Sequence, residues 1–252
     1  MTLSAGIITR TGKPGEARNS DFIFIMSQHN RFELKQTPAH IWVGFSTEHP
    51  VLSSAVYNGG ACAASNILIM KVAENFEGKE QIVQTPENTL AEYCRQLRLG
   101  GTTVGMMTSA SMDSFRRVSR LSQGVEISVM VTAGISNACC AGDRAAWRTF
   151  QVDDNPTGTI NIIIITNAMM SQAAMVESVM VVTEAKTVAM RKLGVKSTVS
   201  GVIATGTGTD AIAVVNGFGP ETIHYCGKHV LFGEMLASAV IEAVTGSLSD
   251  RK

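Results

Sequence analysis

Short apolar runs rich in β-branched and aromatic residues fill the first third of the chain. They alternate with clusters of turn-forming residues, which is the pattern of consecutive β-strands. Four strands are predicted, at residues 21–26, 31–35, 40–45 and 51–57. Asn58-Gly59-Gly60 then interrupts the pattern, and residues 66–72 fit either a strand or the start of a helix.

Helical signals begin at Thr85. Thr followed by Pro is a typical N-cap and first helical residue, so a helix is expected from here to about residue 99. A second helix is expected near residues 112–121. It would carry the only dense basic cluster of the chain, Arg116, Arg117 and Arg120, as a solvated face.

The longest helix is expected between Ser171 as N-cap and Gly194, and the last helix over about residues 229–244. The longer one carries Lys186 in the middle of its apolar stripe and Glu184 on the opposite face. The stripe consists of Met175, Val179, Val182, Met190 and Leu193. An ammonium in such a stripe must reach solvent, find a carboxylate or serve a site. A salt bridge and a functional role are equally compatible with this position.

Three further strands are expected at residues 102–108, 126–132 and 159–166, the last apolar on both faces. Each ends on a Thr followed by small or polar residues, and a fourth run, 202–204, leads into a Thr-rich loop. If these strands share one direction, their polar ends meet at one rim, where open α/β sheets bind ligands. We therefore predict an α/β (mixed α+β) fold. It would be a single domain over residues 1–252, with a mixed β-sheet layered with helices and a ligand site at one rim.

Residues 202–210 read Val-Ile-Ala-Thr-Gly-Thr-Gly-Thr-Asp and precede another apolar run. Gly206 and Gly208 allow a sharp turn and a close approach of backbone amides to a ligand. The loop adds three hydroxyls and one carboxylate, those of Thr205, Thr207, Thr209 and Asp210. A tight hairpin whose Thr residues cap their own backbone explains the loop as well as a ligand-binding role does.

Composition narrows the class of protein. Apolar residues make up 45% of the chain and the net charge is zero, so a substantial core is expected and a nucleic-acid partner is not. The five cysteines have no Cys-x-x-Cys spacing, which disfavours a disulfide framework and a structural zinc site. No signal peptide or membrane span is evident, so a cytoplasmic location without a membrane partner is expected.

The five histidines form no metal-binding spacing, and the Thr-Gly loop matches neither a phosphate-binding nor a dinucleotide-binding motif. His229 is expected at the start of the last helix, where the helix dipole lowers a nearby His pKa and suits a general base. A structural His that caps the helix explains the same position.

Several sequence blocks together match a known family. They are Asn58-Gly59-Gly60, Gly105-Met106-Met107-Thr108, Thr132-Ala133-Gly134-Ile135-Ser136-Asn137-Ala138, Gly142-Asp143, Gly158-Thr159-Ile160-Asn161-Ile162 and Thr166-Asn167-Ala168. They continue with Met175-Val176-Glu177, Thr183-Glu184-Ala185-Lys186, Ala204-Thr205-Gly206-Thr207-Gly208-Thr209-Asp210, Gly227-Lys228-His229 and Gly233-Glu234. Over about residues 50–245 the chain resembles the adenosylcobinamide amidohydrolases of archaeal cobinamide salvage.

The resemblance implies hydrolysis of the amide between the corrin ring and its aminopropanol arm, giving adenosylcobyric acid and aminopropanol. The partner would be a small-molecule corrinoid whose cobalt belongs to the substrate, with no separate cofactor or metal; a homo-oligomer is left open. The expected catalytic groups are Asp210, His229, Lys186, Glu184, Thr207 and Thr209. The expected substrate-binding residues are Asn58, Gly59, Gly60, Thr108, Asn137, Thr166, Asn167, Thr205, Gly206, Gly208 and Lys228.

Two catalytic routes are open at this stage: a directly activated water, or a covalent ester on Thr207 or Thr209. Within either, we expect His229 to move the proton and Asp210 to orient it or the nucleophile. A non-catalytic corrinoid carrier or sensor, and an amidase acting on another amide, are the alternatives.

Overall fold

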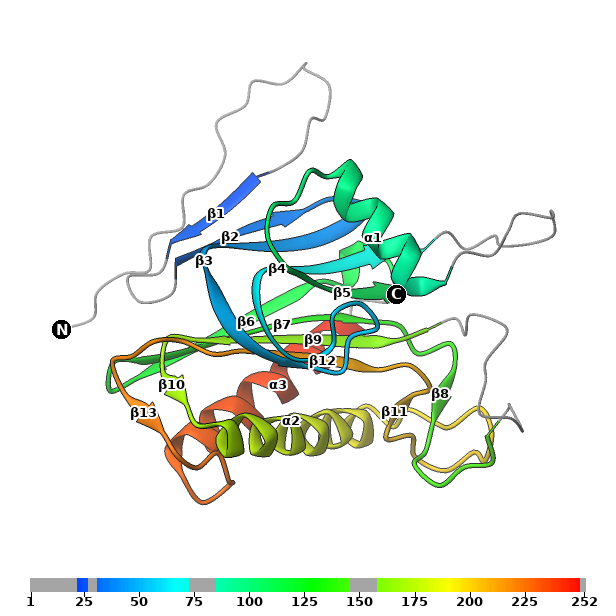
Figure 1. Cartoon of the computed structure of the whole chain (residues 1–252). Helices are drawn as coiled ribbons and strands as arrows, with labels where there is room; N and C mark the ends of the chain where they lie inside the picture. Colours follow the sequence, from blue (N-terminus) through cyan, green and yellow to red (C-terminus); the bar gives the residue numbers. More distant parts are fainter. Residues whose placement is uncertain (1–21, 27–30, 73–84, 146–157, 250–252) are drawn as a thin grey trace, which may run out of the picture.

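One mixed nine-stranded sheet organises the computed structural model, which describes residues 22–26, 31–72, 85–145 and 158–249 (Figure 1). Its strands are β1 (Phe22–Met26), β2 (Arg31–Gln36), β3 (His40–Ser53), β4 (Gly60–Lys71), β5 (Thr103–Thr108), β6 (Arg116–Ser122), β7 (Val125–Ala133), β9 (Ile160–Thr166) and β12 (Ala211–Val215). The order is β1-β2-β3-β12-β9-β7-β6, and β4 pairs with β3 and β5.

The long strand β3 joins the two halves of the sheet. Its first part, up to Gly44, pairs with β2 and with the end of β4. Its last part, from His49 on, pairs with the start of β4, and residues Val51–Ser53 also pair with β12. A register shift between Gly44 and His49 separates the two parts. The predicted strands 40–45 and 51–57 are therefore one strand with an irregularity, and the two halves of the sheet lie one above the other (Figure 1).

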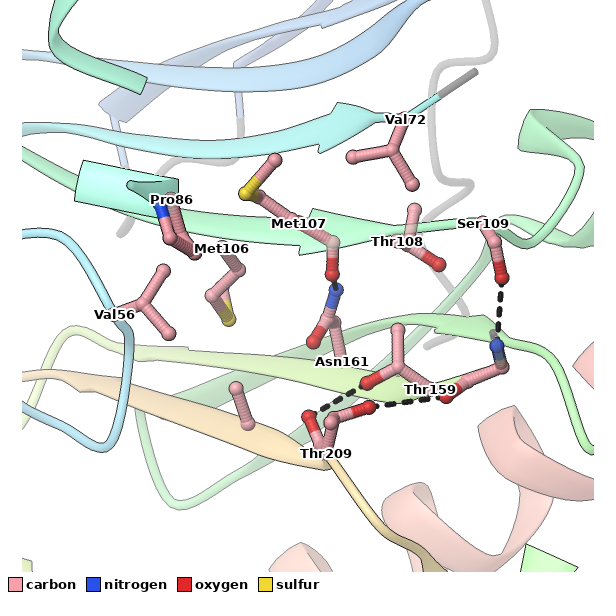
Figure 2. Close-up of a pocket in the computed structure, with 12 residues that line it drawn as sticks. Val56, Val72, Pro86, Met106, Met107, Thr108, Ser109, Thr159, Asn161 and Thr209 are labelled. Atoms are coloured by element: carbon pink, nitrogen blue, oxygen red, sulfur yellow. Dashed lines mark hydrogen bonds between the residues drawn. The ribbon is translucent and has the colours of Figure 1, made fainter. Parts of the chain in front are cut away.

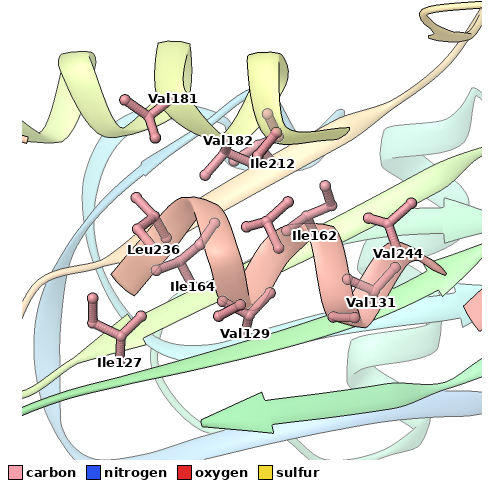
Figure 3. Close-up of a cluster of buried hydrophobic side chains, with 14 of the residues drawn as sticks. Ile127, Val129, Val131, Ile162, Ile164, Val181, Val182, Ile212, Leu236 and Val244 are labelled. Atoms are coloured by element: carbon pink, nitrogen blue, oxygen red, sulfur yellow. The ribbon is translucent and has the colours of Figure 1, made fainter. Parts of the chain in front are cut away.

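Three apolar layers hold this arrangement together. The largest lies between the lower half of the sheet and the helices α2 (Gln172–Lys192) and α3 (Leu231–Ser249) (Figure 3). A second fills the space between the two halves of the sheet, and a third lies under α1 (Pro86–Gln96). Every residue of β9 is buried, which confirms the prediction of a strand covered on both faces.

The two N-caps read from the sequence are confirmed. The side chain of Thr85 accepts a hydrogen bond from the Asn88 amide, and that of Ser171 accepts one from the Ala174 amide. The fold is thus the predicted mixed sheet layered with helices.

The prediction of a helix at residues 112–121 is wrong. Only the 3₁₀ turn η1 (Met112–Ser114) is helical, and β6 follows it, paired antiparallel with β7. The dipeptide Gln123-Gly124 makes the intervening turn with positive φ at both residues (50° and 78°), as a two-residue hairpin requires. The Arg cluster is therefore on a strand, where the Arg117 guanidinium lies over the Phe32 ring at 5.4 Å.

The strand ends gather at one rim only in part. Because β7 runs antiparallel to β9, Ala133 lies beside Ile160 at the start of β9, and the end of β9 points to the opposite side of the sheet. There Thr166 and Asn167 are buried and bond to Glu126 and Gly124, so they are structural and do not line the predicted rim.

One described helix is long and apolar enough, by length and composition, to cross a membrane, whereas the sequence analysis expected no such segment. This is α3, with a mean hydropathy of 1.4. In the structure 56% of it is buried, and it packs against α2, β6 and β7 as a core helix does.

His40 is expected to make stability depend on pH. It is buried, with Nδ1 2.8 Å from the Tyr93 hydroxyl, and burial together with the charge of Lys35 lowers the pKa of His40 below 6.5. The unfolded chain therefore binds this proton more readily, so the contribution is complete above pH 6.5 and is lost as the pH falls toward the folded-state pKa. Urea unfolding between about pH 7 and 5 should show a smaller loss of stability in His40→Gln than in wild type. Equal losses in both proteins would contradict this assignment.

Candidate active site

The Thr-Gly loop lies at the rim where β9 and β12 begin. It contains the short strand β11 (Gly206–Thr207), which pairs with β8 (Ala138–Cys139). The run 202–204 forms only one isolated bridge, from Ile203 to Lys196, and not the predicted strand. The ends of β5 and β7 do reach this rim: Ser109 Oγ accepts the Gly158 amide at 2.7 Å, and the Gly134 amide donates to the Thr159 carbonyl at 2.8 Å.

A buried ion pair between Lys186 and Asp210 is the central feature of the loop. The two side chains are only 9% and 11% exposed, and Lys186 Nζ donates to Asp210 Oδ2. The other oxygen, Oδ1, accepts the Thr207 hydroxyl and the Ile160 amide, the latter at 3.0 Å, while the Thr207 amide donates to Oδ2 at 3.1 Å. Four donors thus fix one carboxylate beside one hydroxyl.

Gly206 makes room for this pair. A Cβ atom there would overlap Asp210 Oδ2 and would lie 2.6 Å from Lys186 Nζ. The lack of a Cβ at Gly206 therefore allows the ion pair to approach the backbone this closely, a contact that the sequence did not reveal.

The two candidate threonine nucleophiles have different surroundings. The Thr207 hydroxyl donates to Asp210, which is the arrangement of a nucleophile and its base. The Thr209 hydroxyl donates to the Gly158 carbonyl at 3.0 Å, and the Thr209 carbonyl accepts the Thr159 hydroxyl at 2.7 Å. Thr209 therefore ties the loop to the start of β9. Thr205 has a similar structural bond, since its Oγ1 accepts the Ala141 amide at 2.9 Å.

The side chain of Asn137, which lies next to the loop, lacks hydrogen-bond partners among the described residues. Both polar atoms of its side chain are buried and have no hydrogen-bond partner in the part of the chain that the structure describes. A Cβ on Gly208 would be 3.7 Å from Asn137 Nδ2, and one on Gly158 would overlap Asn137 Oδ1. A buried, unpaired amide beside a Thr–Asp pair is a group that a ligand can satisfy.

A cavity of about 110 Å³ adjoins the loop (Figure 2). It lies between the end of β5 and the starts of β9 and β12. Its lining consists of Val56, Val72, Pro86, Met106, Met107, Thr108, Ser109, Gly158, Thr159, Asn161, Thr209 and Ala211. Thr108, predicted to bind substrate, lies in this lining. Asn58, Gly59 and Gly60, also predicted to bind substrate, lie between β3 and the first residue of β4 and are not in it; Asn58 Nδ2 donates to the Thr103 carbonyl at 2.8 Å.

His229 is not joined to Asp210, which corrects the expected pairing. It is exposed, lies two residues before α3, and makes no hydrogen bond within the described part of the chain. A Cβ on Gly227 would be 2.8 Å from His229 Nδ1 and 3.0 Å from Glu177 Oε1, so His229 belongs near the first turns of α2. Two other candidates, Glu184 and Lys228, form an exposed ion pair with each other.

Two residues of the site were missed by the sequence reasoning. Cys139 lies close enough to the ion pair for the charges of Asp210 and Lys186 to affect its pKa, and Asn161 lines the cavity with an unpartnered Oδ1. The conspicuous Cys139-Cys140 pair and the polar Asn161 within an Ile-rich strand were the available signals. Over the ranges that the structure describes, no three His, Cys, Asp or Glu residues are grouped to hold a metal ion.

Comparison with known proteins decides the family. The sequence model of the adenosylcobinamide amidohydrolases matches residues 25–252. The chain belongs to this family. A relative from Methanosarcina mazei, itself named adenosylcobinamide amidohydrolase, is 27% identical over 203 residues, or 77% of this chain and 88% of that protein. An uncharacterized protein of Methanocaldococcus jannaschii is 37% identical over 157 residues, or 57% of this chain and 61% of the relative's length.

Solved structures give more distant likenesses. The PH0078 protein from Pyrococcus horikoshii has a TM-score of 0.39 and 11% identity, covering 86% of this chain and 78% of its own. The L-aminopeptidase D-Ala-esterase/amidase from Ochrobactrum anthropi has a TM-score of 0.37 and 9% identity, with 86% and 82% covered.

In an amidohydrolase, a cysteine beside a buried ion pair is a natural nucleophile to consider. Burial raises the pKa of the Cys139 thiol, and the Asp210 carboxylate raises it further, so the reactive thiolate is disfavoured at neutral pH. Cys139→Ala is therefore expected to keep kcat close to that of wild type. Rapid alkylation of Cys139 by iodoacetamide, together with loss of turnover in this variant, would show that the thiol is the nucleophile.

Proposed function

We propose that this protein hydrolyses the amide that joins the corrin ring of adenosylcobinamide to its aminopropanol arm. One water is consumed, and the products are adenosylcobyric acid and aminopropanol, free or phosphorylated. Such a reaction serves corrinoid salvage and takes place in the cytoplasm, with no metal other than the substrate's cobalt. The observation that carries the proposal is the Thr207–Asp210–Lys186 chain of contacts, found in a member of the adenosylcobinamide amidohydrolase family.

Of the two routes open from the sequence, the contacts favour a covalent one. Asp210 accepts the Thr207 proton as Thr207 Oγ attacks the amide carbon, and Asp210 then returns this proton to the departing amine as the carbon–nitrogen bond breaks. Water attacks the resulting Thr207 ester, gives a proton to Asp210, and Thr207 leaves by recovering it. Lys186 holds the carboxylate in the position that both halves of the reaction need.

Asn137 is suited to stabilise the tetrahedral intermediate. The negative oxygen of that intermediate needs a donor already in place in a site that excludes water. Asn137 Nδ2 is buried, has no acceptor in the described part of the chain and lies next to the loop glycine Gly208. The Asn137→Ala substitution is expected to lower kcat by about 10²–10³ while leaving the unfolding midpoint near that of wild type.

The substrate is tested by incubating the protein with adenosylcobinamide, its phosphate and a panel of unrelated linear amides. Aminopropanol and the corrinoid acid are measured together, and they should appear in equal amounts from the first two compounds only. Corrinoid binding without release of either product would support a carrier or sensor. Hydrolysis of another amide in the panel, with no action on adenosylcobinamide, would identify a different amidase.

A further inference from the structure

The cavity beside the loop contains one buried acceptor without a donor. Asn161 is fully buried on β9, and its Nδ2 donates to the Met107 carbonyl at 2.8 Å. That bond fixes the orientation of the side-chain amide, and Oδ1, on the other side, has no hydrogen-bond donor within the residues that the structure describes. Figure 2 shows this oxygen turned away from Met107 among the lining residues. A buried carbonyl that lacks a donor costs stability unless a ligand or water supplies one.

Two hydroxyl groups of the same wall offer complementary donors. Thr108 Oγ1 accepts the Ala110 amide at 3.0 Å, and Ser109 Oγ accepts the Gly158 amide at 2.7 Å. A hydroxyl oxygen that accepts a backbone amide still has its own proton to donate. Neither proton has an acceptor in the described portion of the chain, and Thr108 is only 2% exposed. Both hydroxyls belong to the residues that directly follow Met107, whose carbonyl orients Asn161.

Two other hydroxyls of the lining, those of Thr159 and Thr209, already donate to the Thr209 and Gly158 carbonyls, and the remaining side chains are apolar. Val56, Met106, Met107 and Ala211 offer aliphatic contacts, and the volume of about 110 Å³ has room for several water-sized groups. A ligand group that satisfies this cavity therefore has an N–H donor for Asn161, a carbonyl acceptor for the hydroxyls, and a short aliphatic stem.

We propose that this cavity is a binding subsite for a primary carboxamide on a short aliphatic arm. The corrin ring of adenosylcobinamide carries acetamide and propionamide arms of this kind, so the source of the group rests on the proposed function. Asn161 and Thr108 then act as specificity-determining residues. They hold the corrin periphery while the scissile amide lies at Thr207, and they select a carboxamide over a carboxylate, whose oxygens repel the Asn161 carbonyl.

The test uses small probes, so that it does not depend on turnover. Propionamide has the donor and the acceptor, whereas butanone has the same shape and acceptor but no N–H. Saturation-transfer NMR should show wild type binding propionamide about tenfold more tightly than butanone, because only butanone leaves the Asn161 oxygen unpaired. In Asn161→Leu the ratio should fall to about one. Thr108→Val should weaken both probes by several-fold and keep the ratio. The exposed Thr183→Val, also a loss of a hydroxyl, should change neither.

Equal binding of the two probes by wild type, no binding of either, or insensitivity to Thr108→Val would each overturn the subsite. If Asn161→Leu does not fold, the wild-type ratio and Thr108→Val still decide the question. Selective probe binding without release of aminopropanol from adenosylcobinamide would remove the proposed substrate and leave the carboxamide site. Release of aminopropanol with no probe selectivity would overturn the carboxamide site and leave the proposed substrate in place.

Discussion

Lys186→Met is expected to lower the free energy of unfolding by about 3–5 kcal/mol and to remove most of the turnover. The stability loss follows because the substitution leaves the Asp210 carboxylate buried without its counter-charge. The activity loss follows because Lys186 fixes the carboxylate that exchanges a proton with Thr207. Urea unfolding and the rate of aminopropanol release per folded molecule measure the two effects separately.

The double variant Lys186→Met/Asp210→Asn is the matched control. It removes both charges, so most of the lost stability should return while turnover stays low. Normal turnover per folded molecule in the single variant would mean that the ion pair is structural only. The sequence was compatible with either a salt bridge or a functional role for Lys186. The structure shows a salt bridge whose partner is Asp210, the carboxylate of the Thr-Gly loop, so the same contact can serve both purposes.

Asp210→Asn is expected to lower kcat by about 10²–10⁴, the usual cost of losing a general acid–base group. Thr207→Val should cost a similar or larger factor, and the double variant should be little worse than the more severe single one, because groups that act as a unit are non-additive. His229→Ala provides the contrast. Since no hydrogen bond joins His229 to Asp210, its effect, whatever its size, should multiply with that of Asp210→Asn.

Steady-state kcat values of these variants decide whether Asp210 acts together with Thr207 or with His229. If His229→Ala and Asp210→Asn fail to multiply while Thr207→Val and Asp210→Asn do, the proton passes through His229 as the sequence first suggested. The pairing of Asp210 with Thr207 would then be a resting contact with no role in catalysis.

Local signals in the sequence predicted much of the secondary structure. The caps at Thr85 and Ser171 and the wholly apolar strand β9 are encoded within a few residues, so they could be predicted. The strand β6 could not be predicted, because three Arg residues among its seven obscured the alternation of apolar and polar positions. Its pairing with β7 also depends on the Gln123-Gly124 turn. The continuity of β3 likewise depends on long-range pairing with β4 and β12.

Which side chains meet at the site depended on strand direction. The sequence identified the Thr-Gly loop, Asp210 and Lys186, but not that the last two are partners, since 24 positions and a change of element separate them. It placed Thr166 at the rim because it assumed parallel strands, and the antiparallel pairing of β7 with β9 moved that residue to the far end. The role of Asn161 could not be predicted, because only the folded chain shows that its Oδ1 has no donor among the described residues.

The central claim is that the Thr207 hydroxyl, activated by Asp210, hydrolyses the amide of adenosylcobinamide. Thr207→Val keeps the shape of the side chain and removes only the hydroxyl. The decisive measurement is the rate of aminopropanol release from adenosylcobinamide by wild type and by Thr207→Val, compared at equal concentrations of folded protein. We predict release by wild type and a rate lower by about 10³-fold or more in the variant, with Thr207→Ser retaining part of the activity. Equal rates in wild type and Thr207→Val, or no release by wild type, would contradict this account.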